Sequence, residues 1–163
     1  MNIEYYHASK FGNGALVAEE FKSQMAAKGV TVGVHHVRDV KAGQPAPADL
    51  YVFSSPGRMG KPIGSVRRFL KKIALPAGTK YALLTTEIAP RPDKRTGKVP
   101  TEAEMAKWQR VIPIMNESLQ KRGFVKVAEG TVCVTALKGP LEDGWQEKVT
   151  TFVAGLSGLT AQS

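Results

Sequence analysis

The feature that most constrains the fold is a pair of short segments that are apolar at nearly every position. Residues 50–53 read Leu-Tyr-Val-Phe, and residues 81–84 read Tyr-Ala-Leu-Leu. A strand with one solvated face alternates apolar and polar side chains, and neither segment alternates. The two segments therefore predict strands that are covered on both faces, as in a parallel sheet with helices on either side.

These two segments predict strands over residues 50–53 and 81–85. Three further apolar runs bring the number of expected strands to five. They occupy residues 3–6, 30–37 and 125–135, with Gly130 as a candidate break in the last. The segment 36–49 is too rich in Pro, Gly and Ala for a helix, and it predicts an extended crossing or a single turn. Helical patterns fill the other connections. Strand alternating with helix predicts a parallel sheet joined by right-handed crossovers.

Four helices are expected. They cover residues 13–28, a segment that begins at Pro62, residues 101–123, which open with a capping-box sequence, and a segment that begins at Pro140. Pro113 lies inside the third helix and predicts a kink there. The expected inward-facing residues are Val17, Phe21 and Met25, then Val66, Phe69, Leu70 and Ile73, and finally Trp145, Val149, Phe152 and Val153.

Length and charge suggest what kind of protein contains these elements. The 163 residues fit one domain, and we expect a core over 1–156 with a short tail over 157–163. No apolar run approaches the roughly 18 residues that cross a bilayer, and the N-terminus does not resemble a signal peptide. Cys133 is the only cysteine, so no disulfide forms within the chain, and we expect a cytoplasmic protein. The net charge of +9 favours anionic partners.

The candidate site lies in loops that follow strands, because ligands of open parallel sheets bind beyond the carboxyl ends of the strands. The first such loop, residues 6–14, leads directly into a helix, where main-chain N–H groups and the helix dipole favour an anion. Lys10 either adds charge there or points outward. The alternative is a tight turn without a ligand. The residues expected to hold the anion are Ser9, Lys10, Phe11, Gly12, Asn13 and Gly14.

A dinucleotide-binding loop is the competing interpretation of this segment. That loop needs the pattern G-x-G-x-x-G, and position 17 is Val. It also needs an acidic residue near the end of the second strand, where Asp39 comes late. The two-glycine match is therefore weak evidence for a dinucleotide.

Residues 8–14, followed by Val17-Ala18-Glu19, resemble the phosphate loop of the flavodoxin superfamily. That loop typically ends in Gly-Asn-Thr. The version here is most similar to the branch that includes the menaquinone-dependent protoporphyrinogen oxidases. The resemblance extends over about residues 1–156. It implies an α/β fold with a doubly wound five-stranded parallel sheet of order 2-1-3-4-5, helices on both faces, and flavin mononucleotide (FMN) as cofactor.

The second loop resembles the segment that flanks the isoalloxazine ring in this superfamily. Its candidate residues are Ser55, Pro56, Gly57, Arg58, Met59 and Gly60. Met59 offers a soft apolar surface for a flat ring. Arg58 either stacks on the ring or neutralises charge on a reduced flavin. The alternative is a surface turn with an exposed arginine.

The third loop, Thr85, Thr86, Glu87 and Ile88, matches by position rather than by motif. Glu87 either accepts a hydrogen bond from a ring N–H or caps a turn. Residues 89–100 follow, with four basic residues and three prolines. This segment is either a solvated loop or a docking surface.

Three departures from the resemblance modify these expectations. Gly14 stands where the superfamily usually has a phosphate-binding threonine, so we expect weaker but retained binding, and Gly14→Thr is expected to tighten it. Phe11 and Met59 are the available substitutes for the usual ring-stacking aromatics. The chain is also basic, whereas electron-transfer flavodoxins are acidic.

The expected function is therefore an FMN-binding redox flavoprotein, either an oxidoreductase or an electron-transport protein. Its acceptor is a quinone-like molecule or an acidic partner protein. The alternative function is a flavin-free binding module that uses its basic surface for an anionic partner.

Other constellations carry less weight. His35 and His36 are adjacent on a strand and point to opposite faces, so they do not chelate one metal ion, and His7 is expected to be structural. A solvated helix face explains the basic cluster at Arg67, Arg68, Lys71 and Lys72 better than nucleic-acid binding does.

Overall fold

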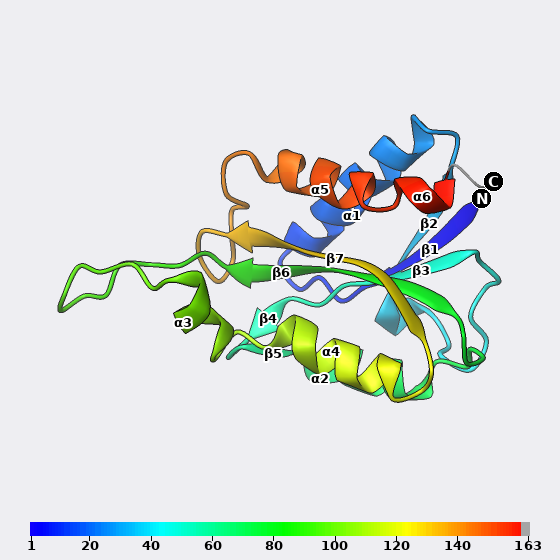
Figure 1. Ribbon diagram of the computed structural model, residues 1–163, viewed down its shortest axis with the longest axis horizontal. Coiled ribbons are helices and arrows are strands. Elements are labelled where there is room, and N and C mark those ends of the chain that lie inside the picture. Colours follow the sequence, from blue (N-terminus) through cyan, green and yellow to red (C-terminus); the bar gives the residue numbers. More distant parts are fainter. Residues whose placement is uncertain (161–163) are drawn as a thin grey trace.

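Five parallel strands form the central sheet in the computed structural model, which describes residues 1–160 (Figure 1). They are β1 (Asn2–His7), β2 (Thr31–His36), β3 (Leu50–Phe53), β6 (Lys80–Ile88) and β7 (Val125–Val134). Their order is β2-β1-β3-β6-β7, and every neighbouring pair is parallel. Numbered among themselves, the strands have the order 2-1-3-4-5, which confirms the doubly wound fold.

Helices cover both faces of this sheet (Figure 1). Helices α1 (Asn13–Ala26), α5 (Trp145–Ala154) and α6 (Ser157–Thr160) lie on one face. Helices α2 (Gly64–Lys72) and α4 (Val111–Gln120) lie on the other. The expected tail over 157–163 is therefore helical as far as residue 160, and residues 161–163 lie outside the described part.

Two apolar clusters, one on each face, confirm that the sheet is buried between layers. All four residues of β3 are buried, alternating between the clusters. The cluster under α1 and α5 includes Val17, Phe21, Met25, Val149, Phe152 and Val153. The cluster under α2 and α4 includes Val66, Phe69, Leu70, Ile73, Met115 and Leu119. Apolar burial on both faces is what a parallel sheet requires, and the non-alternating strands supply it.

Two expected helix starts at prolines are wrong. Pro62 lies in the two-residue strand β5 (Lys61–Pro62), and α2 begins only at Gly64. Pro140 follows a cis peptide bond, and α5 begins at Trp145. A proline fixes φ near −65°, which suits extended and turn backbone as well as a first helical turn, so proline alone does not identify a helix start.

The single helix expected over 101–123 is also wrong. The segment forms a short helix α3 (Glu102–Ala106) and the separate helix α4. Thr101 caps α3 as expected, because its Oγ1 accepts from the Glu104 N–H at 3.2 Å. Pro113 lies in the first turn of α4, where its missing N–H removes no helical hydrogen bond and produces no kink.

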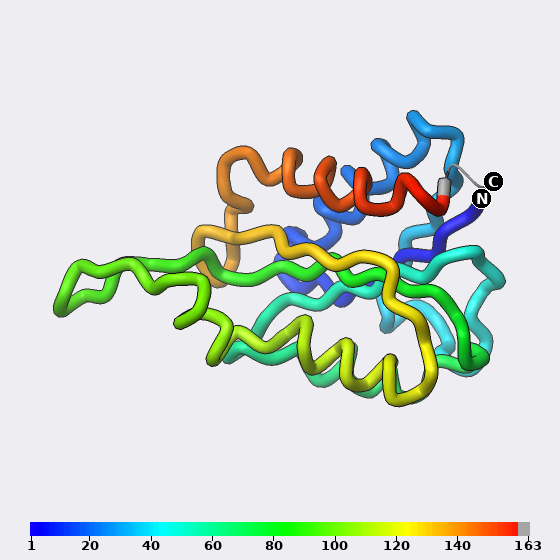
Figure 2. The backbone as a smooth tube through the Cα atoms, in the orientation of Figure 1, coloured from blue at the N-terminus to red at the C-terminus, as the bar shows by residue number. Residues whose placement is uncertain are grey.

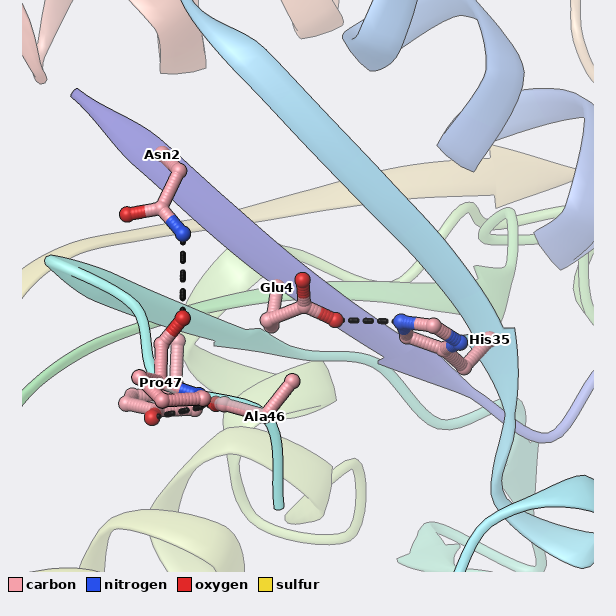
Figure 3. Close-up of polar contacts among 6 residues, drawn as sticks. Asn2, Glu4, His35, Ala46 and Pro47 are labelled. Carbon is pink, nitrogen blue, oxygen red and sulfur yellow. Dashed lines mark hydrogen bonds and ion pairs between the residues drawn. The ribbon is translucent and has the colours of Figure 1, made fainter.

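The crossing from β2 to β3, residues 37–49 of the described range, contains no α-helix, as expected, and consists of extended chain with two turns, η1 (Val37–Asp39) and a turn closed by the Gln44 N–H donating to the Lys41 carbonyl at 3.0 Å. Figure 3 shows one contact that fixes this crossing to the sheet, in which the Asn2 side chain donates to the Pro47 carbonyl at 3.0 Å. The same view shows Glu4 of β1 in contact with His35 of β2, which joins these two strands to each other.

The segment between β6 and α3 projects beyond the carboxyl ends of the strands, while the chain termini lie at the opposite end (Figure 2). Its tip is a hydrogen-bonded turn, in which the Asp93 carboxylate accepts from the N–H groups of Arg95 and Thr96. We refer to residues 89–100 as the basic arm. No helix within residues 1–160 is long and apolar enough to cross a membrane.

Candidate functional site

A cavity of about 540 Å³ lies at the carboxyl ends of the strands. This volume falls within the roughly 300–1,000 Å³ of small-molecule sites. The cavity is lined by residues at or just beyond the carboxyl ends of β1, β2, β3, β6 and β7, together with the first turns of α1 and α2. The strand order reverses between β1 and β3, so the cavity occupies the switch point at which ligands of doubly wound sheets bind.

The structure brings residues from all three expected loops to this cavity. From the first loop they are Ser9, Lys10, Phe11, Asn13 and Gly14. From the second and third loops they are Pro56, Gly57, Arg58, Thr86, Glu87 and Ile88. Five other expected residues lie outside the cavity lining: Gly12, Ser55, Met59, Gly60 and Thr85.

The first loop is held in a turn by its own hydrogen bonds. Ser9 Oγ accepts from the Gly12 N–H at 3.0 Å, which leaves the Ser9 hydroxyl hydrogen able to donate elsewhere. Gly12 precedes α1 in the left-handed region at φ 92°, and no side chain caps this helix. The first-turn N–H groups of α1 have no partner within the helix, so the turn offers main-chain donors and a positive dipole end to an anion.

The His7 side chain stabilises this turn through a hydrogen bond to its backbone. Its side chain is buried, and its Nδ1 accepts from the Ser9 N–H at 3.1 Å. Burial lowers the pKa of His7 to about 4, with help from the neighbouring His36 and Arg38, while Asp39 opposes the shift. His7 therefore stays neutral at pH 7 as a hydrogen-bond acceptor, which agrees with the structural role expected for it.

The low pKa of His7 makes stability depend on pH. The unfolded chain takes up this proton near pH 6.5 and the folded chain only near pH 4, so the free energy of unfolding falls as the pH falls between these values. Between pH 7 and pH 4, we expect the free energy of unfolding to fall by up to about 3 kcal/mol more in wild type than in His7→Asn. Asparagine keeps a hydrogen-bond acceptor at this position and does not titrate. Urea unfolding at both pH values measures the difference, and equal losses would contradict the role assigned to His7.

The second loop forms a tight hairpin. Strands β4 (Gly57–Arg58) and β5 are joined by Met59 and Gly60 at φ 52° and 76°, the positive values that a type I′ turn needs. Ser55 ties the base together, because its Oγ accepts from the Ile63 N–H at 3.1 Å. Met59 is 93% exposed and does not line the cavity, so this conformation does not provide the ring contact expected of it.

The expectation that residues 85–88 form a loop is wrong, because they are the last four residues of β6, which extends to the cavity wall. The Thr86 N–H donates to the Ser55 carbonyl at 3.2 Å, which joins this strand end to the second loop. Thr85 is fully buried and its hydroxyl pairs with that of Thr131 at 3.3 Å, so it is a structural residue. These contacts place Thr86, Glu87 and Ile88 beside Pro56 and Gly57.

Glu87 has an unusual environment for a carboxylate. Its Oε1 is buried without a hydrogen-bond partner among the described residues, and a Cβ on Gly57 would lie only 3.1 Å from its Cγ. Burial raises the pKa of Glu87, and the Val111 N–H lowers it in part. The cavity wall therefore includes a carboxyl group with one buried oxygen that no described residue donates to.

Sequence reasoning missed the contributions from β2, α2 and the loop after β7. His36, Arg38, Ile63, Gly64, Ser65 and Arg68 line the cavity on the side of η1 and α2, and Val134 and Leu137 line it after β7. The position of His36 and Val134 at the ends of parallel strands is a usable signal for both. The side chain of Arg68, one turn into α2, gave no such signal.

The sheet order and the position of the cavity define a flavodoxin-like doubly wound α/β protein. Flavodoxin 1 from Bacillus cereus has a TM-score of 0.68, covers 97% of this chain and 98% of its own, and shares 20% of residues. A flavodoxin from the domain Archaea has a TM-score of 0.70 with 99% of both chains covered and 15% identity. Rubredoxin oxygen:oxidoreductase from Desulfovibrio gigas has a TM-score of 0.68 at 13% identity, and the chain spans 36% of its length.

No protein-family model and no curated protein matches the sequence. At the identities above, structural likeness establishes the fold. The chain has the flavodoxin fold, which confirms the fold implied by the sequence resemblance.

Proposed function

We propose that this protein binds FMN and passes electrons or hydride to a small quinone-like acceptor. The observation that carries the proposal is the convergence of three strand-end loops on one cavity at the switch point of the sheet. The solved structures with the same fold include proteins named flavodoxin, in keeping with a flavin in this position.

The first loop would hold the phosphate of FMN. Ser9 can donate through its hydroxyl and Asn13 through its amide, while the first turn of α1 supplies main-chain N–H groups. Lys10 lines the same end and adds a positive charge.

The second and third loops would flank the ring. The Glu87 carboxyl offers an acceptor to a ring N–H, and Ile88 supplies apolar contact. Bound FMN supplies one- and two-electron redox chemistry, and the protein supplies position and electrostatics. Arg58 places positive charge at this end and would stabilise negative charge on the reduced cofactor.

The test is a titration of purified protein with FMN, followed by flavin absorbance and fluorescence. We expect saturable binding at one site per chain and a yellow complex that survives gel filtration. A chain that stays colourless in excess FMN would overturn the proposal and favour the alternative of a flavin-free module that binds an anionic partner through its basic surface.

Gly14 offers a sharper test of the phosphate position. A Cβ on Gly14 would lie 3.3 Å from Ser9 Cβ, so the threonine that was expected to tighten binding also crowds the loop. Comparing Gly14→Thr with Gly14→Ala removes this crowding from the result, because both carry the Cβ. We expect the Gly14→Thr variant to bind FMN about 10- to 100-fold more tightly than the Gly14→Ala variant, because the threonine hydroxyl adds one hydrogen bond to a charged group. Equal affinities of the two variants would place the phosphate elsewhere.

A further inference from the structure

The cavity carries more positive charge than one phosphate needs. Four cationic side chains line it: Lys10, Arg38, Arg58 and Arg68. Among the described residues, Glu87 is the acidic residue of the lining, and burial shifts it toward its neutral form. Like charges gathered around one cavity repel one another unless an anion lies between them.

Two of these cations lie apart from the first loop. Arg38 belongs to η1 and Arg68 to α2, and both elements contribute buried side chains, Val37 and Phe69, to the apolar cluster on the face of the sheet opposite α1. His36 connects the Arg38 backbone to the first loop, because its Nε2 donates to the Ser9 carbonyl at 3.2 Å while its Nδ1 accepts from the Arg38 N–H. We call Arg38, Ser65 and Arg68 the η1–α2 end of the cavity.

Within the described residues, the protein provides these two guanidinium groups with one ion pair only, and that pair is weak. Arg68 forms no ion pair with any residue in the described range, and one of its terminal nitrogens lies 3.2 Å from where a Cβ would stand on Gly64. Arg38 is 3.8 Å from the Asp39 carboxylate, and both side chains are largely exposed, so this pair is weak. The Ser65 hydroxyl lines the cavity beside them.

Resting on the proposed function, we propose that the η1–α2 end binds a sulfonate, carboxylate or phosphate group of the acceptor. Guanidinium groups hold such oxyanions through paired hydrogen bonds, and a hydroxyl adds a further donor. The rest of the lining includes Ile63 and Leu137, which suit an apolar body. The acceptor class is therefore a flat apolar molecule that carries an anionic group.

Binding to the oxidised FMN complex tests the proposal without any turnover. The probes are 9,10-anthraquinone-2-sulfonate and its neutral analogue 2-(hydroxymethyl)anthraquinone, measured by calorimetry at low ionic strength. We expect the sulfonate to bind at least about tenfold more tightly than the neutral probe. Arg68→Gln is expected to remove most of that difference and to leave the neutral probe unaffected.

Arg67→Gln is the matched control, because Arg67 is the adjacent exposed residue of α2 and lies outside the cavity lining. Both variants lose one charge, so an equal loss in the two would reveal long-range attraction alone and overturn the site. Equal affinity of wild type for the two probes would also overturn it.

Flavin binding separates this proposal from the proposed function. Should the protein fail to bind FMN, the same probe comparison on the flavin-free chain still supports or overturns the anion site. Should Arg68→Gln weaken FMN binding about tenfold without weakening riboflavin binding, the η1–α2 end holds the phosphate of FMN and the second anion site is overturned.

Discussion

Gly60→Ala is expected to destabilise the protein by about 4 kcal/mol, which lowers Tm by roughly 10 °C for a chain of this size. A Cβ at this position would lie 1.7 Å from the Trp108 carbonyl oxygen. That oxygen belongs to rigid backbone, because the next turn of chain is fixed by the Arg110 N–H donating to the Gly60 carbonyl at 2.6 Å. The hairpin and the α3–α4 connection must therefore separate to admit the methyl group.

Gly78→Ala is the control for the backbone strain that any alanine has at a positive φ. Gly78 also has a positive φ, 89°, but nothing lies within 4 Å of its Cβ position. The Gly78→Ala substitution should lower the free energy of unfolding by only about 1–2 kcal/mol, which is the strain of an alanine in a left-handed conformation. Thermal unfolding of both variants measures the difference, and similar losses would show that the hairpin does not pack against residue 108 as described.

The order of strands and helices could be predicted because each strand of the sheet has a recognisable apolar pattern in the sequence. A segment such as Leu50–Phe53, apolar at every position, is stable only between two layers. The predictions from prolines, two helix starts and one kink, were wrong because the same fixed φ fits a strand (β5), the first turn of a helix (α4) and the position after a cis peptide bond. Two-residue strands such as β4 and β5 are too short to leave a pattern in the sequence.

The candidate site was predictable where it follows strand ends and not where it depends on packing. Eleven of the sixteen expected residues line the cavity, because parallel strands bring their carboxyl ends together. Met59 was misplaced since the hairpin turn directs it to solvent. Arg68 was assigned to a solvated helix face, and its approach to the cavity depends on how α2 packs beside η1.

The second large effect concerns the cofactor's phosphate. FMN and riboflavin share the same ring and ribityl chain, so their affinities differ only through the phosphate. The first loop offers Ser9, Asn13 and the N–H groups that open α1, with Lys10 nearby. Two hydrogen bonds to a charged group, at roughly 1.5–3 kcal/mol each, correspond to a preference for FMN of at least about 100-fold.

The ratio of these two affinities shows whether the turn between β1 and α1 binds an anion. Parallel calorimetric titrations of the purified protein with FMN and riboflavin measure this ratio. We expect a dissociation constant for FMN at least about 100-fold below that for riboflavin, with the preference reduced in Ser9→Ala. Equal affinities for the two flavins would contradict phosphate binding at this turn.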